Sequence, residues 1–310
     1  MYPKAIVSSR SAKVGCRSAG GFLSAWNRAR ARQFAHRVEA CLQGFGQTHT
    51  HRKHAGGAVA DFADRLNPLM PMTTNLSNSR MVWPFDTFGS PQPEFPPVES
   101  ADEYGAVLIG GELSTPWLLA AYRRGIFPWP SDELPQLLPW FSPDPRGILE
   151  FADLHISRRL RDTLRSGRFR TTLDADFGAV IAGCAQPRDD GVWITDEMVR
   201  AYTELHQLGH AHSLEVWQGD EIVGGVYGVA IGGYFSAESM FHRATDASKV
   251  ALVGLVDHLR QRGYTLLDIQ TLSDHTERMG GTEIPREEFL GRHRQAMELP
   301  VTFQSRSANP

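Results

Sequence analysis

The stretch from Tyr234 to Gln270 constrains the fold of this chain more than any other part of it. It begins with a hairpin strand rich in aromatic residues, continues with an apolar helix opened by Asp-Ala-Ser-Lys (246–249), and ends with the strand Leu-Leu-Asp-Ile-Gln (266–270). Two strands spaced around one helix can deliver side chains from both strands to a single small site.

Strand alternation predicts where the polar side chains of this unit point. Side chains two residues apart on a strand share a face, so Asp268 and Gln270 point to the same side. By the same rule Ser236, Glu238 and Met240 share one face of the first strand. We expect Glu238, Asp268 and Gln270 to meet in one small site. A buried polar network that closes the sheet is the alternative interpretation.

The charge of the chain is divided unevenly along its 310 residues. Residues 1–80 carry twelve Lys and Arg against three acids, a net charge of +9, whereas residues 81–310 carry −12. A basic arm for nucleic acid, an organelle transit peptide, or translated sequence upstream of the true start would each have this composition. We favour the last, because Met70, Met72 and Met81 precede the first residues with a fold-like pattern. Residues 1–80 are thus expected to be a basic, disordered extension.

The cysteines and apolar runs indicate the compartment. Cys16, Cys41 and Cys184 have no paired spacing, so the sequence predicts neither a disulfide framework nor a zinc site. No run approaches the roughly 18 apolar residues that a spanning helix requires. We expect a cytoplasmic protein without a membrane segment and without a bound metal.

The fold class predicted from the pattern is α+β with two domains. A small N-terminal α/β domain over residues 81–144 contains an apolar strand within 105–114 and a helix from Thr115. A mixed α/β domain over 145–310 follows, and its order of strands and helices is compatible with an acetyltransferase-like (GNAT-type) fold. Its predicted elements are helices over 157–166, 176–185, 195–207, 247–262 and 285–296, strands over 169–173 and 265–270, and hairpins through 213–241.

An arginine-rich helix follows the predicted domain boundary. At 3.6 residues per turn its apolar residues form one stripe and its arginines lie on the opposite side. The stripe consists of Ile156, Leu160 and Leu164. The opposite side carries Arg158, Arg161 and Arg165. In an acidic body, arginines concentrated on one helix indicate a phosphate-binding surface. A solvated helix face is the alternative.

Tryptophans lie on loops rich in Gly and Pro. Trp129 belongs to Gly-Ile-Phe-Pro-Trp-Pro (125–130) and Trp193 to Gly-Val-Trp-Ile-Thr (191–195). A base can stack on an indole in such a position. Packing in the core is the more common role of tryptophan, and these residues alone do not decide between the two.

Separated sequence blocks resemble the leucyl/phenylalanyl-tRNA–protein transferase family in order and spacing. The resemblance covers about residues 84–304. The blocks are Gly110-Gly111-Glu-Leu-Ser114, Tyr122-Arg-Arg-Gly-Ile-Phe-Pro-Trp129, Trp140-Phe-Ser-Pro-Asp-Pro-Arg146, Leu154-His-Ile-Ser-Arg158, Trp193-Ile-Thr, His206-Gln-Leu-Gly-His-Ala-His212, Ser-Leu-Glu-Val-Trp217, Glu238-Ser-Met-Phe241, Ala247-Ser-Lys249, Leu267-Asp-Ile-Gln270 and Asp274-His-Thr276.

The resemblance implies an aminoacyltransferase that moves Leu or Phe from charged tRNA to the N-terminal Arg or Lys of acceptor proteins and so marks them for degradation. It implies a small N-terminal domain followed by an acetyltransferase-like domain. An aminoacyl ester is already activated, so we expect no cofactor. We also expect a monomer.

Site residues follow from the resemblance residue by residue. Glu238, Asp268 and Gln270 match polar residues required for transfer. Four residues match substrate contacts, the first two with the terminal adenosine and the last two with the Leu or Phe side chain: Trp129, Trp193, Phe235 and Met240. Three residues match a tRNA-binding segment: Arg158, Arg161 and Arg165. Three positions depart from the family pattern: Asp162 and Ser166 stand where basic residues are frequent, and Ser273 replaces a common Asn.

The resemblance suggests a mechanism at the last strand. We expect the acceptor amine and the tRNA end to meet over an accessible Asp268–Gln270 pair beside the two tryptophans. Gln270 Oε1, polarised by Asp268, would accept a hydrogen bond from the attacking amine, and Asp268 as the direct base is the alternative. Glu238 would favour Arg or Lys at the acceptor terminus.

Two other functions remain open from the residues alone. A CoA-dependent N-acetyltransferase of similar fold would need a glycine-rich loop before the helix, and residues 242–249 contain no glycine. A non-catalytic RNA-binding protein would use the arginines and tryptophans without chemistry.

Overall fold

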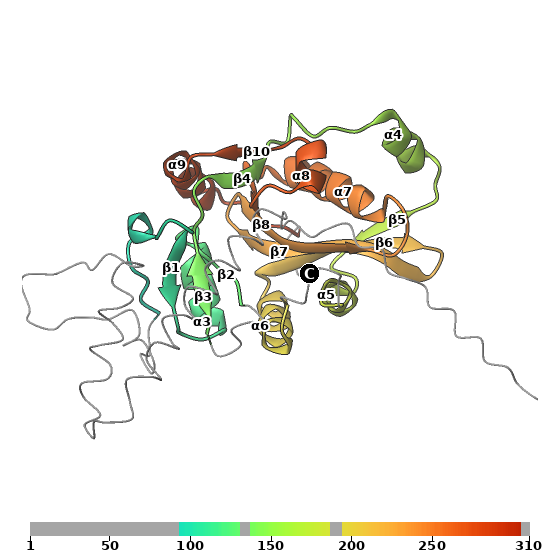
Figure 1. Cartoon of the computed structure of the whole chain (residues 1–310). Coiled ribbons are helices and arrows are strands. Elements are labelled where there is room, and N and C mark those ends of the chain that lie inside the picture. The colour runs from blue at the N-terminus through green and yellow to red at the C-terminus, as the bar shows by residue number, and fades with distance from the viewer. Residues whose placement is uncertain (1–92, 131–136, 187–193, 305–310) are drawn as a thin grey trace, which may run out of the picture.

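The structure is a computed structural model that describes residues 93–130, 137–186 and 194–304 (Figure 1). Its elements, in chain order, are η2 (Val98–Ser100), β1 (Ala106–Ile109), α3 (Thr115–Tyr122), β2 (Phe127–Pro128), β3 (Pro139–Phe141), β4 (Arg146–Leu149), α4 (Arg158–Arg165), β5 (Arg170–Leu173), α5 (Phe177–Cys184), α6 (Asp196–Gln207), β6 (Ala211–Gln218), β7 (Glu221–Ile231), β8 (Tyr234–His242), α7 (Ala247–Arg262), β9 (Leu266–Gln270), α8 (Asp274–Arg278), β10 (Gly281–Ile284) and α9 (Arg286–Met297).

The described strands form two sheets. The first is antiparallel and has the order β1-β3-β2; the second has seven strands in the order β10-β4-β9-β8-β7-β6-β5. Every pair in the second sheet is antiparallel except β8 and β9. A parallel pair needs a crossover connection, and α7 supplies it. The mixed architecture confirms the predicted α+β class.

Helices cover both faces of the seven-stranded sheet. α5 and α7 both contact β6, β7 and β8, and Figure 1 shows them on opposite faces, α5 and α6 below the sheet and α7 and α8 above it. α7 ends at Arg262 and is capped by Gly263, whose positive φ of 84° allows the left-handed conformation in which its N–H bonds back to the last turn. The chain then re-enters the sheet as β9, next to β8.

Each face of the sheet has its own apolar core. The core around α7 contains Leu160 of α4 and Phe303 near the C-terminal end. The core on the other face contains residues of α5 and α6 together with residues of β1 and α3, so the three-stranded sheet packs onto it.

The division into domains at 81–144 and 145–310 stays a prediction, and the extension over residues 1–80 lies outside the described residues.

The long predicted elements agree with the structure and several short ones were missed. The helices predicted over 157–166, 176–185, 195–207 and 247–262 match α4, α5, α6 and α7 to within one residue at each end. The missed strands β2, β3, β4 and β10 have two to four residues each, too few to show a period of two. One of them, β4, begins at a residue of the site described next.

Candidate active site

The strands β8 and β9 run side by side over only part of their length. Their parallel ladder ends at the pair Ser236 and Asp268, although β8 continues to His242 and β9 to Gln270. Gln270, the last residue of β9, has a φ of 63°, which is uncommon for a residue other than glycine. Polar side chains thus gather where the ladder between the two strands ends.

A β-bulge places Glu238 at the same point. Along the β7–β8 ladder, Gly228 pairs with Ala237 and Tyr227 pairs with Ser239, so Glu238 is the extra residue of β8. A bulge bends the strand locally and redirects a side chain. Ser236 and Glu238 still follow the normal alternation and lie on the same side of the sheet, whereas the residues after Glu238 are shifted by one position.

The carboxylate of Asp268 is fully engaged by its neighbours. Arg146 donates to both of its oxygens, from Nε to Oδ1 at 2.9 Å and from Nη2 to Oδ2 at 2.6 Å. The hydroxyl of Tyr234 donates to Oδ2 at 2.7 Å, and the backbone N–H of Gln270 donates to Oδ1 at 2.7 Å. Asp268 therefore holds the backbone of Gln270 in its unusual conformation.

Arg146 joins three parts of the fold around this carboxylate. It is the first residue of β4, its guanidinium lies 4.8 Å from the ring centroid of Phe127 and 4.4 Å from that of Phe289 in α9, and its Nη1 donates to the carbonyl of Gly125 at 3.1 Å. Both Arg146 and Asp268 are fully buried. Burial opposes the charge of Arg146, but the Asp268 carboxylate raises its pKa overall. The pair is a bidentate ion pair inside the protein.

Gln270 and Glu238 share a second set of hydrogen bonds. The Nε2 of Gln270 donates to Oε1 of Glu238 at 3.0 Å and lies 3.4 Å from Oγ of Ser236, which itself donates to Oε1 at 2.9 Å. Burial raises the pKa of Glu238 to about 7, although its hydrogen bonds act in the opposite direction. This carboxyl group can gain or lose a proton near neutral pH.

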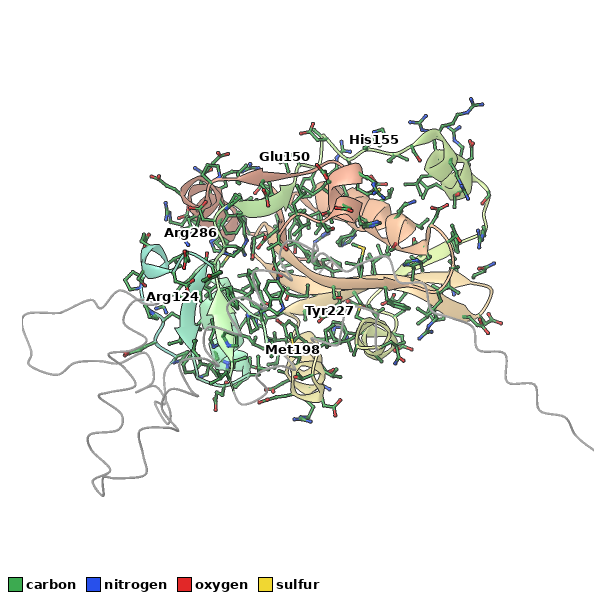
Figure 2. The ribbon with its side chains drawn as sticks, in the orientation of Figure 1. Arg124, Glu150, His155, Met198, Tyr227 and Arg286 are labelled. Atoms are coloured by element: carbon green, nitrogen blue, oxygen red, sulfur yellow. The ribbon has the colours of Figure 1, made fainter. Side chains whose placement is uncertain are left out.

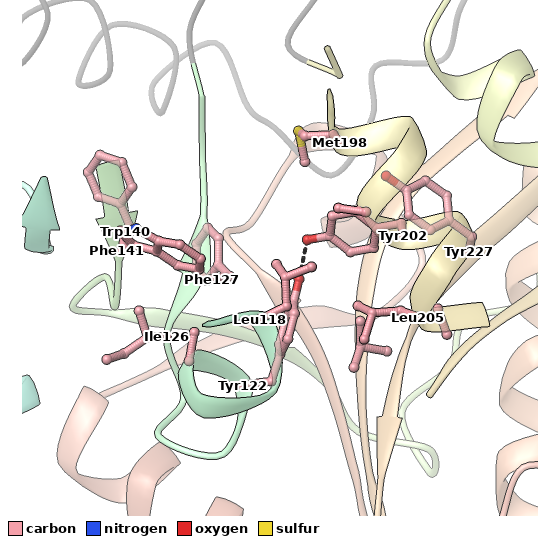
Figure 3. Close-up of a cluster of buried hydrophobic side chains, with 14 of the residues drawn as sticks. Leu118, Tyr122, Ile126, Phe127, Trp140, Phe141, Met198, Tyr202, Leu205 and Tyr227 are labelled. Atoms are coloured by element: carbon pink, nitrogen blue, oxygen red, sulfur yellow. Dashed lines mark hydrogen bonds between the residues drawn. The ribbon is translucent and has the colours of Figure 1, made fainter. Parts of the chain in front are cut away.

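Two tyrosines extend the network toward α3 and α6. The hydroxyl of Tyr202 donates to Oε2 of Glu238 at 3.3 Å and is hydrogen bonded to the hydroxyl of Tyr122 (Figure 3). Burial first, and then the charge of Glu238, raise the pKa of both tyrosines well above the usual value. Both phenols therefore stay protonated. We call the whole set the carboxylate–amide network: Tyr122, Arg146, Tyr202, Tyr234, Ser236, Glu238, Asp268 and Gln270.

The structure brings together the three residues predicted to be catalytic but does not expose them. Glu238, Asp268 and Gln270 are only 2%, 0% and 4% exposed. The expectation of an accessible Asp268–Gln270 pair was wrong, because Arg146 and Tyr234 cover the carboxylate. Asp268 also contacts Gln270 through its backbone N–H rather than through its side-chain amide. This saturation disfavours Asp268 as the direct base.

Phe235 and Met240 lie together on the other face of the sheet. Both belong to the core around α7, where the ring of Phe235 stacks on that of Phe303 with centroids 5.6 Å apart. The shared face predicted for Glu238 and Met240 was wrong, because the bulge at Glu238 shifts the alternation by one residue. The role of Phe235 and Met240 as walls of an apolar pocket stays a prediction.

Of the two predicted adenosine contacts, Trp129 is described and Trp193 lies outside the described residues. Trp129 is partly buried and packs against Phe127 and Phe141, with ring centroids 6.4 Å and 5.8 Å away. It follows β2 directly, where its backbone N–H donates to the carbonyl of Pro139 in β3 at 2.9 Å, next to the segment that contacts Arg146. Its stacking role stays a prediction.

The arginines of α4 are exposed, as the predicted helix requires. Leu160 is buried against the α7 core, whereas Leu164 is 37% exposed, so the apolar stripe is shorter than expected. Arg158, Arg161 and Arg165 are all exposed. Figure 2 shows that α4, which follows the labelled His155, lies at the outer edge of the molecule. The structure does not bring them into the carboxylate–amide network.

Sequence reasoning missed four residues of the network. Arg146 and Tyr122 appeared only as members of sequence blocks, without a role, and Tyr202 and Tyr234 only as part of a predicted helix and a predicted hairpin. A buried arginine gives no periodic signal, because its partner is distant in sequence. Tyrosine at a core position was the usable signal, since a buried phenol needs a hydrogen-bond partner.

The described residues were searched for membrane-spanning helices and for metal-binding groups. None of the helices in residues 93–130, 137–186 and 194–304 has the length and apolarity to cross a membrane. The same ranges hold no group of three or more His, Cys, Asp or Glu side chains that could bind a metal ion.

The chain combines a mixed α/β fold with a buried acid–amide site, and comparison with known proteins identifies its family. The family model described as leucyl/phenylalanyl-tRNA protein transferase matches residues 148–294, and the model of that family's N-terminal domain matches residues 111–144. A leucyl/phenylalanyl-tRNA–protein transferase of Solidesulfovibrio magneticus is 52% identical over 231 residues, which are 71% of this chain and 93% of the relative. One of Aromatoleum aromaticum is 52% identical over 202 residues, 64% of this chain and 84% of the relative.

The chain belongs to the leucyl/phenylalanyl-tRNA–protein transferase family, as the sequence blocks indicated. Neither the CoA-dependent acetyltransferase nor the non-catalytic RNA-binding protein is favoured. Among solved structures, L-PGS from Bacillus licheniformis is 12% identical with a TM-score of 0.31 and covers 42% of this chain and 48% of its own. A likeness this low carries no argument about the fold.

Proposed function

We propose that this chain is an aminoacyltransferase that moves Leu or Phe from charged tRNA to the N-terminal Arg or Lys of acceptor proteins, which are thereby marked for degradation. The proposal includes a monomeric enzyme in the cytoplasm, where translation supplies charged tRNA. It also includes an acetyltransferase-like arrangement of the larger sheet, supported by the parallel β8–β9 pair, the crossover helix α7 and the early end of the β8–β9 ladder.

The carboxylate–amide network is the observation that carries the proposal. Its strands β8 and β9 lie inside the range matched by the family model, and it joins the three residues that resemble the family's required polar residues. The arrangement contains a group suited to proton exchange near pH 7, Glu238, next to an amide held in a fixed orientation, Gln270. Both features suit the attack of an amine on an ester.

The reaction balances without an added reagent. The acceptor nitrogen attacks the carbonyl carbon of the aminoacyl ester, a C–N bond forms, the ester C–O bond breaks, and the departing ribose oxygen takes up the proton that the amine loses. A free α-amino group has a pKa near 8, so part of it is already neutral at pH 7. The enzyme therefore has mainly to align the two reactants and pass on one proton.

The network assigns different tasks to its members. Nε2 of Gln270 faces Glu238, so its Oε1 is the atom left to accept a hydrogen bond from the attacking amine. Glu238 relays the proton, and Asp268 positions the backbone of Gln270. Because these side chains are nearly buried, the amine reaches them only after side chains around the end of the β8–β9 ladder have moved.

The direct test mixes the purified full chain with phenylalanyl-tRNA or leucyl-tRNA and a peptide that begins with Arg. We expect the peptide mass to increase by one Phe or Leu residue, and no increase for the same peptide with an acetylated N-terminus. Acetyl-CoA in place of charged tRNA should leave the peptide unchanged. A peptide that gains an acetyl group, or no group from any donor, would overturn the proposal.

A further inference from the structure

Six arginines lie within thirteen residues of α4 and β5, and we call them the arginine surface: Arg158, Arg159, Arg161, Arg165, Arg168 and Arg170. All six are exposed. In the part of the chain that the structure describes, no carboxylate lies within 4 Å of any of them. The segment contains a single acid, Asp162, so its net charge is +5 while residues 81–310 together carry −12.

The helix α4 supplies only a short part of this surface. Arg158 and Arg165 are seven residues apart, or about 10 Å at the rise of an α-helix. Arg161 lies between them on the same side, and Leu160 anchors the opposite side in the α7 core. Figure 1 shows α4 and β5 at the same end of the molecule, away from α9 and β1. The surface therefore continues from α4 along the chain to β5 at the same end of the molecule.

Aromatic rings support the two arginines at β5. The guanidinium of Arg168 lies 4.7 Å from the ring centroid of Phe169, and that of Arg170 lies 4.9 Å from the ring centroid of Trp217 in β6. The indole of Trp217 is fixed in turn, since its Nε1 donates to Oγ1 of Thr172 at 2.7 Å. A guanidinium lying on a ring keeps its N–H edge available for two oxygens of a phosphate group.

The position of β5 at the edge of the sheet leaves the guanidinium groups accessible. β5 is the last strand of the seven-stranded sheet, and it pairs with β6 alone among the described strands. Beyond Trp217, the turn between β6 and β7 carries Asp220, and β7 begins with Glu221, so two acids end the cationic surface on that side. The surface is thus a bounded strip that runs from α4 onto the sheet edge.

We infer that Arg168 and Arg170 form a second phosphate-binding site, which extends tRNA binding from α4 onto the edge of β5. The inference rests on the proposed function and deepens it, because it adds residues that contact the sugar–phosphate backbone of the tRNA stem. Charge complementarity supports the occupant: the strip is cationic and unpaired, while the rest of the body repels nucleic acid. Arg168 and Arg170 also supply positive charge that Asp162 and Ser166 do not.

The test measures the salt dependence of binding to uncharged tRNA. The β5 variant, Arg168→Ser/Arg170→Ser, is compared with wild type and with a control, Arg123→Ser/Arg278→Ser, which removes two exposed charges elsewhere. A third variant, the α4 variant, removes the charges of Arg158, Arg161 and Arg165. Each lost phosphate contact should lower the slope of log K against log salt by about 1, so we expect a decrease of about 2 in the β5 variant and none in the control.

A substrate without a stem separates this inference from the proposed function. Phenylalanyl-adenosine should be used equally well by wild type and by the β5 variant. If the α4 variant lowers the slope but the β5 variant behaves like the control, the second site is refuted and the proposed function stands. If neither lowers it, both the second site and the tRNA-binding role of α4 fail. Equal unfolding midpoints confirm that the variants are folded.

Discussion

The carboxylate–amide network and the arginine surface hold their charges in opposite ways. In the network, Arg146 is fully buried and donates to both oxygens of Asp268, and its guanidinium lies against the rings of Phe127 and Phe289. On the arginine surface, the guanidinium groups are exposed and none has a carboxylate partner among the described residues. A buried charge depends on the geometry of its partners, whereas an exposed one acts mainly through its sign.

This difference separates the two tasks that an aminoacyl transfer requires. Alignment of an amine with an ester requires side chains fixed to within about half an ångström, which a saturated buried network provides. Capture of a large polyanion requires positive charge over a wide area, which the exposed arginines provide. The same residue type, arginine, serves both regions, so arginine substitutions test the comparison most directly.

The largest effect is expected from Arg146→Met. It leaves Asp268 buried without its ion-pair partner, and removal of one partner of a buried pair costs about 3–5 kcal/mol. Unfolding by urea should show this loss, whereas Arg161→Met on α4 should change the unfolding free energy by no more than about 0.5 kcal/mol. The double variant Arg146→Met/Asp268→Leu should recover part of the loss. An equal loss of unfolding free energy in Arg146→Met and Arg161→Met would contradict the difference between the buried and the exposed arginines.

A slightly smaller effect is expected from Glu238→Gln, and it depends on pH. Because burial raises the folded-state pKa of Glu238 to about 7, the fold favours the protonated form. Its contribution to stability is fully present below the unfolded value near 4.5 and is lost as the pH rises through 7. Relative to wild type, the variant should therefore gain roughly 2–3 kcal/mol of unfolding free energy between pH 5 and pH 8.

Chemical denaturation at both pH values measures this gain. Glu197→Gln, at an exposed position of α6, is the matched control and should show no comparable change. The opposite sign, a variant that loses stability relative to wild type as the pH rises, would mean that Glu238 is ionised in the fold at all these pH values.

The sequence predicted the members of the candidate site better than its surroundings. Asp268 and Gln270 were found because a strand period of two persists to the end of β9. The prediction that they lie in one site with Glu238 was correct. Met240 was assigned to the wrong face because no sequence signal marks the bulge in β8. A bulge arises from pairing with β7, and pairing is a property of two strands.

The burial of the site also could not be predicted from the sequence. Arg146 lies 122 residues before Asp268, and only the antiparallel pairing of β4 with β9 brings them together. A four-residue strand such as β4 has too few positions to show alternation. The arginines of α4, in contrast, were predicted correctly to be exposed, because helical periodicity is a local property.

Gln270→Ala tests the amide of the network without touching its ion pair. Removal of a group that takes part in proton transfer costs typically about 100-fold or more in rate. We expect peptide transfer to fall by at least that factor while the affinity for uncharged tRNA stays the same. Ala has the same Cβ as Gln, so the backbone strain at the positive φ of residue 270 is unchanged. Full transfer activity in this variant would refute the role assigned to Gln270.

The smallest effect is expected from Arg161→Lys, and it is the sharpest test of the contrast between the two regions. Lysine keeps the charge but loses the planar fork, so Arg146→Lys should disrupt the bidentate pair with Asp268 and lower both stability and transfer. On the exposed side of α4, where charge alone is expected to matter, Arg161→Lys should leave the salt slope for uncharged tRNA unchanged and Arg161→Ser should lower it by about 1. A lysine at position 161 that weakens tRNA binding as much as serine does would show that α4 also depends on guanidinium geometry. The distinction between the fixed charges of the network and the interchangeable charges of α4 would then fail.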